Sequence, residues 1–97
     1  MNPIAVVATL KAKAGKEAEL RKELLALISP TRQEPGCLRY DLHEELEHPE
    51  VFVFYEQWKS PGHLEEHLTR PHMEAFRAKM DDLLSEMPDI RVLETIG

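Results

Sequence analysis

Cysteine is almost absent from this chain of 97 residues, and the single one, Cys37, can form neither an intrachain disulfide nor a four-thiolate zinc site. An unpaired cysteine is typical of a reducing cytosol. No apolar run approaches the roughly 20 residues that span a bilayer. The N-terminal segment also lacks the basic stretch that precedes the apolar part of a signal peptide. We therefore expect a cytoplasmic protein with no membrane partner.

Positive charge is scarce as well. Twelve lysines and arginines stand against 18 aspartates and glutamates, so the formal net charge is −6. The basic residues are scattered, and the positive stripe that phosphate contacts require is missing. Gly-rich loops of the GxGxxG type and the GxSxG motif are missing too. These absences argue against nucleic acid as a partner and against flavin or nicotinamide held by the usual loops.

What is present fits one small folded domain over residues 1–97. Hydrophobic residues make up 42% of the chain and charged residues 31%, a balance that is too apolar for a disordered protein. A domain of this size buries a modest share of its surface, so it gains stability by forming a dimer.

The periodicity of apolar residues predicts four strands and two helical units. The strands are expected over residues 4–10, 37–44, 51–58 and 90–96. The helices are expected over residues 16–28, ended by Pro30, and over residues 62–68 and 71–87, the last ended by Pro88. In the second strand, Leu38, Tyr40 and Leu42 should share one face. The order strand–helix–strand–strand–helix–strand predicts a ferredoxin-like α+β fold with an antiparallel four-stranded sheet.

The third strand, VFVFYEQW, is apolar on both faces. One face carries Phe52, Phe54 and Trp58, and the other carries Val51, Val53 and Tyr55. The helices can cover only one face of the sheet, and soluble monomers rarely leave a large apolar patch bare. We therefore expect a homodimer packed sheet on sheet. Loops or the chain ends covering the second face are the alternative.

Three side chains are candidates for proton transfer. His67 and His72 bracket Pro71 at a helix break, where an imidazole could act as a general base or bind the backbone instead. Glu56 shares a strand face with Trp58, and in an apolar setting burial would raise its pKa. Glu56 could equally pair with an arginine or histidine at the strand end. Trp58 is either a pocket wall with an N–H donor or plain core.

The segment His63-Leu64-Glu65-Glu66-His67 matches the H-x-x-E-H pattern of inverted zinc peptidases. The two histidines would lie one helical turn apart. The pattern is short and degenerate, and a chain this small leaves little room for a third ligand and a substrate cleft. We therefore expect a solvated or pocket-edge pair and no metal site.

Residues 34–76 combine a Pro-Gly-Cys turn, a Phe-x-x-Tyr-Glu-x-Trp strand and a spaced His…Pro-His pattern. Together these motifs resemble the antibiotic biosynthesis monooxygenase (ABM) domain family. The opening strand, the Gly-Lys helix start and the closing strand extend the likeness over essentially the whole chain.

The resemblance implies a dimeric α+β barrel and, by analogy with several members, oxidation of a quinol or phenolic aromatic by O₂ without flavin, haem or metal. It also implies that His67, His72 and Glu56 are catalytic. The residues it assigns to substrate binding are Trp58, Phe52, Phe54, Phe76 and Met80. On this hypothesis a base deprotonates the substrate, which then passes an electron to O₂.

One departure from the family pattern argues against haem degradation. Haem-degrading relatives carry an asparagine in the first strand, and the strand here, IAVVATL, has none.

Two functions other than oxygenation stay open. One is a proton-transfer isomerase for a small phosphorylated sugar-like substrate, and the other is a non-catalytic dimer that binds a small ligand.

Overall fold

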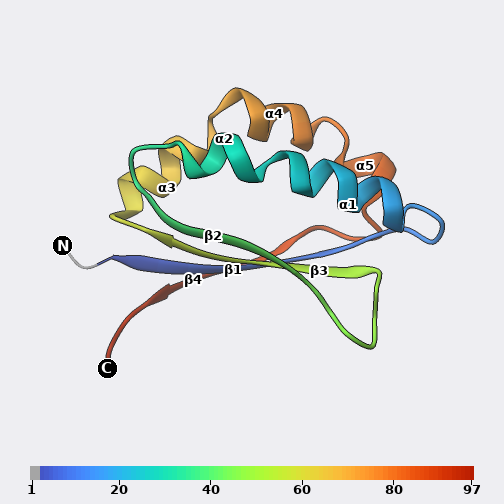
Figure 1. The fold of residues 1–97 in the computed structure, drawn as a ribbon, viewed down its shortest axis with the longest axis horizontal. Helices are drawn as coiled ribbons and strands as arrows, with labels where there is room; N and C mark the ends of the chain where they lie inside the picture. Colours follow the sequence, from blue (N-terminus) through green and yellow to red (C-terminus); the bar gives the residue numbers. More distant parts are fainter. Residues whose placement is uncertain (1–2) are drawn as a thin grey trace.

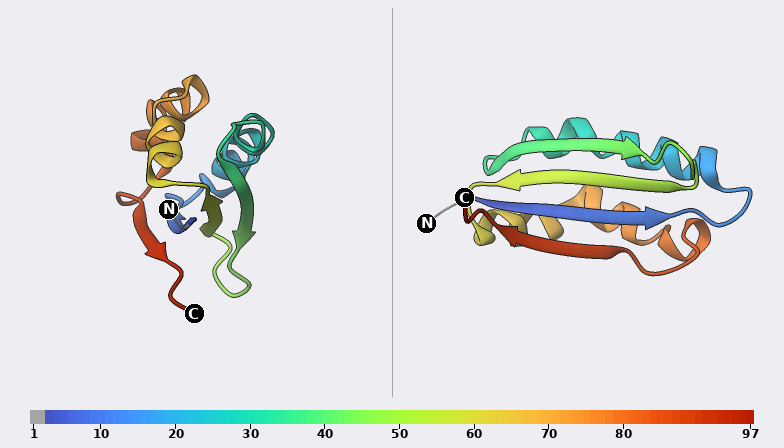
Figure 2. Two further views of the ribbon diagram at one scale, coloured as in Figure 1. Left: turned by 90° about the vertical axis from the view of Figure 1, so that its left-hand side faces the viewer. Right: turned by 90° about the horizontal axis from the view of Figure 1, so that it is seen from below.

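Four antiparallel strands form one sheet in the computed structural model, which describes residues 3–97 (Figure 1). The strands are β1 (Ile4–Lys11), β2 (Cys37–Glu44), β3 (Val51–Trp58) and β4 (Asp89–Glu94), in the spatial order β2-β3-β1-β4. The helices are α1 (Glu17–Ala26), α2 (Ile28–Arg32), α3 (Pro61–Leu68), α4 (Pro71–Arg77) and α5 (Met80–Leu83). All of them cover the same face of the sheet (Figure 2). This is the ferredoxin-like α+β fold that the sequence predicts.

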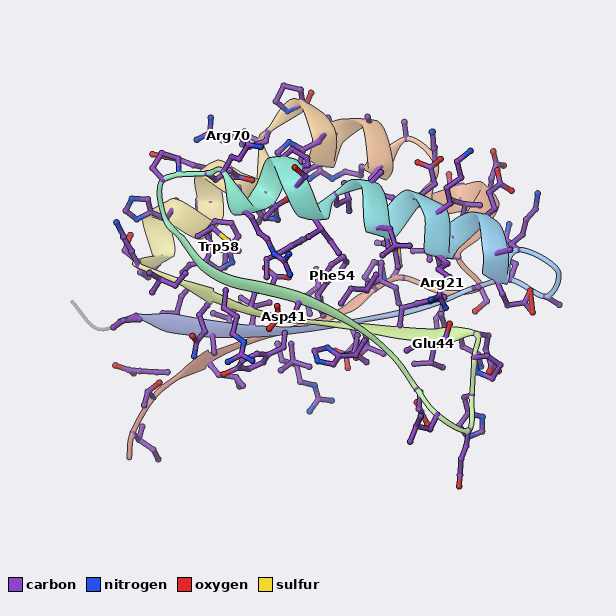
Figure 3. The ribbon with its side chains drawn as sticks, viewed as in Figure 1. Arg21, Asp41, Glu44, Phe54, Trp58 and Arg70 are labelled. Carbon is purple, nitrogen blue, oxygen red and sulfur yellow. The ribbon has the colours of Figure 1, made fainter. Side chains whose placement is uncertain are left out.

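Strand β3 shows how the core forms. Its residues alternate strictly in burial, and Phe52, Phe54, Glu56 and Trp58 are the buried set. Phe54 and Trp58 lie in the layer between sheet and helices (Figure 3). Because side chains alternate across a strand, the remaining four residues of β3 face away from the helices. The chain's main apolar cluster therefore fills the space between the two layers.

Helix α3 begins with a serine cap followed by a proline. The Ser60 side chain accepts a hydrogen bond from the His63 backbone N–H at 3.3 Å, and Pro61 occupies the first helical position. A serine cap satisfies one of the free N–H groups there, and proline has none to lose. Pro71 likewise occupies the first position of α4, although no side chain that the structure describes caps that helix.

The expected single helix that ends at Pro30 is wrong. The chain continues from α1 through Leu27 into α2, and Pro30 is the third residue of that second helix. The first turn of a helix has no partners for its N–H groups, so proline costs little there. Residues 30–32 are therefore helical, and the loop begins after them.

The helix expected over residues 71–87 is also wrong in its second half. It divides into α4 and α5, and Leu84 then pairs as an isolated bridge with Ala12. This pairing ends the helical stripe before Met87, which is 81% exposed. The last strand spans Asp89–Glu94, so Ile96 lies beyond it and is exposed.

Leu38 does not share a face with Tyr40 and Leu42 as expected. The pairing of β2 with β3 shifts register between Cys37 and Arg39, which leaves Leu38 half exposed. A bulge of this kind inserts one extra residue and re-aims those that follow. Tyr40 is thereby placed opposite Glu56. Among the helices of residues 3–97, none has both the length and the apolar character that crossing a bilayer requires.

Candidate functional site

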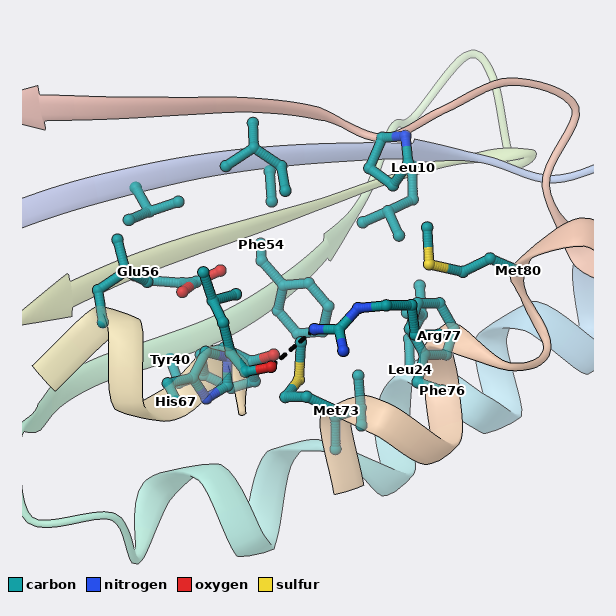
Figure 4. Close-up of a pocket in the computed structure, with 17 residues that line it drawn as sticks. Leu10, Leu24, Tyr40, Phe54, Glu56, His67, Met73, Phe76, Arg77 and Met80 are labelled. Atoms are coloured by element: carbon teal, nitrogen blue, oxygen red, sulfur yellow. Dashed lines mark hydrogen bonds between the residues drawn. The ribbon is translucent and has the colours of Figure 1, made fainter. Parts of the chain in front are cut away.

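A cavity of about 130 Å³ lies between the helices and the sheet (Figure 4). Most of its wall is apolar, and Phe54, Phe76 and Met80 contribute to it from β3, α4 and α5. Glu56 from β3 and His67 from α3 face the same space. Five of the eight residues predicted for the site therefore meet around one cavity.

Two further polar side chains line this cavity. Tyr40 comes from β2, and it is almost completely buried, which raises the pKa of its hydroxyl. Arg77 comes from α4, and its Nη2 donates a hydrogen bond to the Leu68 carbonyl oxygen at 2.7 Å, dashed in Figure 4. Neither residue is predicted for the site from the sequence. The bulge that turns Tyr40 inward has no evident sequence signal.

Glu56 is a carboxyl group held in an apolar wall. It is 5% exposed, and its Oε1 accepts a hydrogen bond from Trp58 Nε1 at 2.9 Å. Burial raises the pKa of Glu56 to about 7, although the Trp58 hydrogen bond works in the opposite direction. The Trp58 indole, and not an arginine or histidine at the strand end, is its hydrogen-bond partner. A group with this pKa can give or take a proton at neutral pH.

His67 is buried on the cavity side of α3, with 1% of its surface exposed. Its Nδ1 lies 2.8 Å from Glu34 Oε2, and its ring packs 4.6 Å from that of Trp58. Burial lowers the pKa of His67, and the nearby Glu34 carboxylate partly offsets this effect. The imidazole is therefore mainly neutral at pH 7, the form that accepts a proton.

Glu34 is the centre of a cluster of charged and polar side chains that the sequence does not predict. It is 8% exposed and follows α2 in the turn before β2. The same oxygen, Oε2, lies 3.0 Å from Nε2 of His72, and this nitrogen also lies 3.1 Å from the Thr31 hydroxyl. Arg70 Nε lies 3.4 Å from the other oxygen, Oε1. A glutamate next to Pro-Gly looks like a solvated turn residue, so its burial is visible only in the fold.

The cluster has the donor set of a metal site. One atom each from Glu34, His67 and His72 lie within 4.8 Å of one another. The guanidinium of Arg70 faces the same carboxylate, however, and a divalent cation would compete with it at close range. The imidazole–carboxylate distances are also those of hydrogen bonds. We therefore interpret the cluster as a hydrogen-bonded network.

The remaining predicted site residues lie away from the cavity wall. His72 is directed to Glu34 and Thr31, and not to the backbone at the helix break. Phe52 is buried towards the other end of β3, where it lines a separate surface hollow. Trp58 is fully buried behind Glu56, to which it donates its N–H.

The H-x-x-E-H pattern does not form a joint site. His63 Nδ1 lies 2.8 Å from the Ser60 hydroxyl oxygen, whereas His67 turns to Glu34. The two histidines therefore have different partners. Within the described part of the chain, the cluster of Glu34, His67 and His72 does not include His63.

Comparisons with known proteins agree with this picture. A family model described as antibiotic biosynthesis monooxygenase matches residues 3–79. The "Putative monooxygenase Rv0793" of Mycobacterium tuberculosis is 37% identical, over 95% of this chain and 90% of that protein. The "Probable quinol monooxygenase YgiN" of Escherichia coli K12 is 31% identical, over 94% of this chain and 96% of that protein.

Two further comparisons concern length and shape. The crystal structure of PA3566 from Pseudomonas aeruginosa superposes with a TM-score of 0.95 and 34% identity, and covers 100% of this chain and 97% of that one. An uncharacterised protein of Synechocystis, sll1783, is 32% identical over 94% of this chain. The present chain spans only 62% of that relative's length.

Proposed function

This chain belongs to the antibiotic biosynthesis monooxygenase family, and on that premise we propose that it is a monooxygenase that acts without a bound cofactor. The proposed substrate is a quinol or another phenolic aromatic, with O₂ as co-substrate. One observation carries the proposal. His67 and Glu56, whose pKa values are both shifted by burial, face the same apolar cavity.

The proposed reaction starts when the substrate hydroxyl gives its proton to His67 Nε2 or to the Glu56 carboxylate. The phenolate passes one electron to O₂, and the two radicals then combine to form a peroxide. Breakdown of the peroxide leaves one oxygen atom in a quinone carbonyl and releases the other as water. One phenol and one O₂ thus give one quinone and one water. The protein has to bind the substrate, take up its hydroxyl proton and exclude solvent from the cavity.

The predicted site residues differ in the part they take in this proposal. Phe54, Phe76 and Met80 contact the aromatic ring in the cavity. Trp58 acts through the hydrogen bond to Glu56. His72 reaches the base only through Glu34, so it is the weaker candidate for that role. A contact of Phe52 with substrate stays a prediction, because Phe52 lies outside this cavity wall.

The composition of the cavity wall favours one of the candidate substrate classes over the other. A phosphorylated sugar needs polar partners for its hydroxyls and phosphate, whereas this wall is mainly apolar. An aromatic ring fits such a wall, and the Escherichia coli relative is named as a probable quinol monooxygenase. We therefore favour the oxygenase over the isomerase. A non-catalytic ligand-binding dimer is the outcome that an inactive but ligand-binding protein would support.

We also propose that the working form is a homodimer in the cytoplasm. The sheet face turned away from the helices is apolar at its centre and charged at its edges, as interfaces commonly are. The location rests on Cys37, which is a free, partly buried thiol.

An oxygen electrode tests the proposal with the purified, metal-stripped protein and a panel of quinols and phenols that includes hydroquinone. We expect substrate-dependent oxygen uptake that a chelator leaves unchanged. His67→Gln should reduce the rate about 100-fold or more, because the amide keeps a similar volume and a donor for Glu34 but cannot take up a proton.

His48→Gln is the matched control, since His48 is exposed in the turn between β2 and β3. It should leave the rate unchanged, and circular dichroism should show that each variant keeps its fold. The assignment of the base is wrong if His67→Gln and His72→Gln both retain wild-type oxygen uptake. No uptake with any member of the panel would contradict the oxygenase itself.

A further inference from the structure

One oxygen of Glu34 is shared by two histidines from different helices. His67 on α3 places Nδ1 at 2.8 Å from Oε2, and His72 on α4 places Nε2 at 3.0 Å from the same atom. The carboxylate side chain is 6% exposed, and that of His67 is 2% exposed. These contacts are therefore made in the protein interior, where a polar group must find its partner within the fold.

The chemistry of these atoms fixes where the protons lie. A carboxylate oxygen can only accept hydrogen bonds, so the facing nitrogen of each imidazole carries hydrogen. In neutral His67 this is Nδ1, which leaves Nε2 with its lone pair free. Nε2 has no hydrogen-bond partner among the described residues. It is also not one of the fully buried side-chain atoms that lack a partner, so this nitrogen keeps some accessible surface. Because His67 lines the cavity, the edge of its ring that is not bonded to Glu34 can face this space.

We propose that Glu34 is a positioning residue that holds His67 in the Nδ1–H tautomer and turns the unprotonated Nε2 towards the cavity. The catalytic use of this arrangement rests on the proposed function, in which Nε2 takes the proton of the substrate hydroxyl. When it does, the new imidazolium faces the Glu34 carboxylate directly. The pairing of a buried carboxylate with a histidine base serves this purpose in other enzymes.

Other groups complete the surroundings of the pair. Arg70 faces the second oxygen of Glu34 at 3.4 Å, so the carboxylate has a cationic partner on the side away from His67. Tyr40 presents its ring to His67 edge-on at 5.6 Å between centroids, and Glu56 faces the same cavity from the sheet. His72 fills the remaining approach to Oε2 as the second N–H donor. The imidazole is thus held in one orientation.

The tautomer can be measured without any substrate. Long-range ¹⁵N–¹H NMR spectra distinguish Nδ1–H from Nε2–H imidazoles, and we expect His67 in the wild type at pH 8 to be in the Nδ1–H form. In Glu34→Met the side chain has no oxygen to accept a hydrogen bond from Nδ1, so the Nδ1–H form of His67 should lose its preference and the Nε2–H form should become populated. Glu66→Met is the control, because Glu66 is exposed and contacts Arg70 but not His67.

The inference is overturned if wild-type His67 is in the Nε2–H form, or if Glu34→Met leaves its tautomer unchanged. If Glu34→Met does not fold, the wild-type spectrum alone still decides the tautomer. This outcome is independent of oxygen uptake, so it stands or fails separately from the proposed function.

Kinetics test whether the tautomer matters for the reaction. With hydroquinone as the probe, Glu34→Met should lower kcat about 100-fold and leave KM nearly unchanged, because the substrate still fits the cavity, but Nε2 is no longer held unprotonated and the imidazolium no longer faces a carboxylate. Glu66→Met should keep both constants. A changed tautomer with an unchanged kcat would show that His67 is not the base.

Discussion

At the scale of single residues, burial shifts the pKa values of two ionisable groups in opposite directions, and each shift favours the uncharged form. It raises the pKa of Glu56 and lowers the pKa of His67, because in each case the charged form is poorly solvated. The two groups line the same cavity, one from the sheet and one from the helices. Burial therefore favours the uncharged form of both groups, on opposite walls of one cavity.

The pKa of Glu56 makes stability depend on pH. Because its folded-state pKa of about 7 is above its ordinary value of 4.5, the stabilising effect is complete below pH 4.5 and is lost as the pH rises through 7. Glu56→Gln removes this titration. Relative to the variant, the wild type should therefore lose about 3 kcal/mol in free energy of unfolding between pH 4.5 and pH 8. Urea unfolding at a series of pH values measures the difference, and parallel curves would contradict it.

At the scale of the elements, the turn before β2 positions Glu34 under α3. Gly36 lies in this turn, and a Cβ at that position would overlap the side chain of His63 at the start of α3. The Gly36 carbonyl also accepts a hydrogen bond from the Lys59 N–H at 2.9 Å. The close approach of backbone and helix here depends on the absence of a side chain.

Gly36→Ala should therefore push α3 away from the turn and lower the free energy of unfolding by about 1–3 kcal/mol, as overpacking generally does. Gly62→Ala is the matched control, because an added Cβ there meets only the Ser60 hydroxyl at an ordinary 3.6 Å. That change, within a helix, should be neutral or slightly stabilising. Thermal unfolding of both variants compares them, and equal effects would refute the role given to Gly36.

The elements also show which features a sequence can reveal. The bounds of β2 and β3 are predicted correctly, because alternating and β-branched residues reflect local geometry directly. Pro30 and Met87 mislead, since a proline is compatible with the first turn of a new helix and an apolar residue can lie beyond the end of one. The burial of Glu34 depends on three segments that meet only in the fold. The sequence therefore predicts His67 and Glu56 but not the group that orients His67.

At the scale of the whole molecule, the sheet has one face covered by helices and one face without such cover (Figure 2). One row across the open face runs from Asp41 on β2 through Tyr55 and Val7 to Arg91 on β4. Its two central members are only partly buried, and its outer members carry charge. A second copy of the chain would cover the apolar centre and leave the charged edges in water.

Sedimentation velocity at micromolar concentration should therefore find a particle of twice the chain mass of 11.2 kDa. Val53→Lys places a charge on the open face of β3 and should shift the equilibrium to monomer, since an unpaired charge at an interface centre is costly to desolvate. Leu25→Lys is the control, because Leu25 is a half-exposed residue of α1 in the helix layer. A wild type that sediments as a monomer would contradict the homodimer, whereas a Val53→Lys variant that remains dimeric would contradict the open sheet face as its interface.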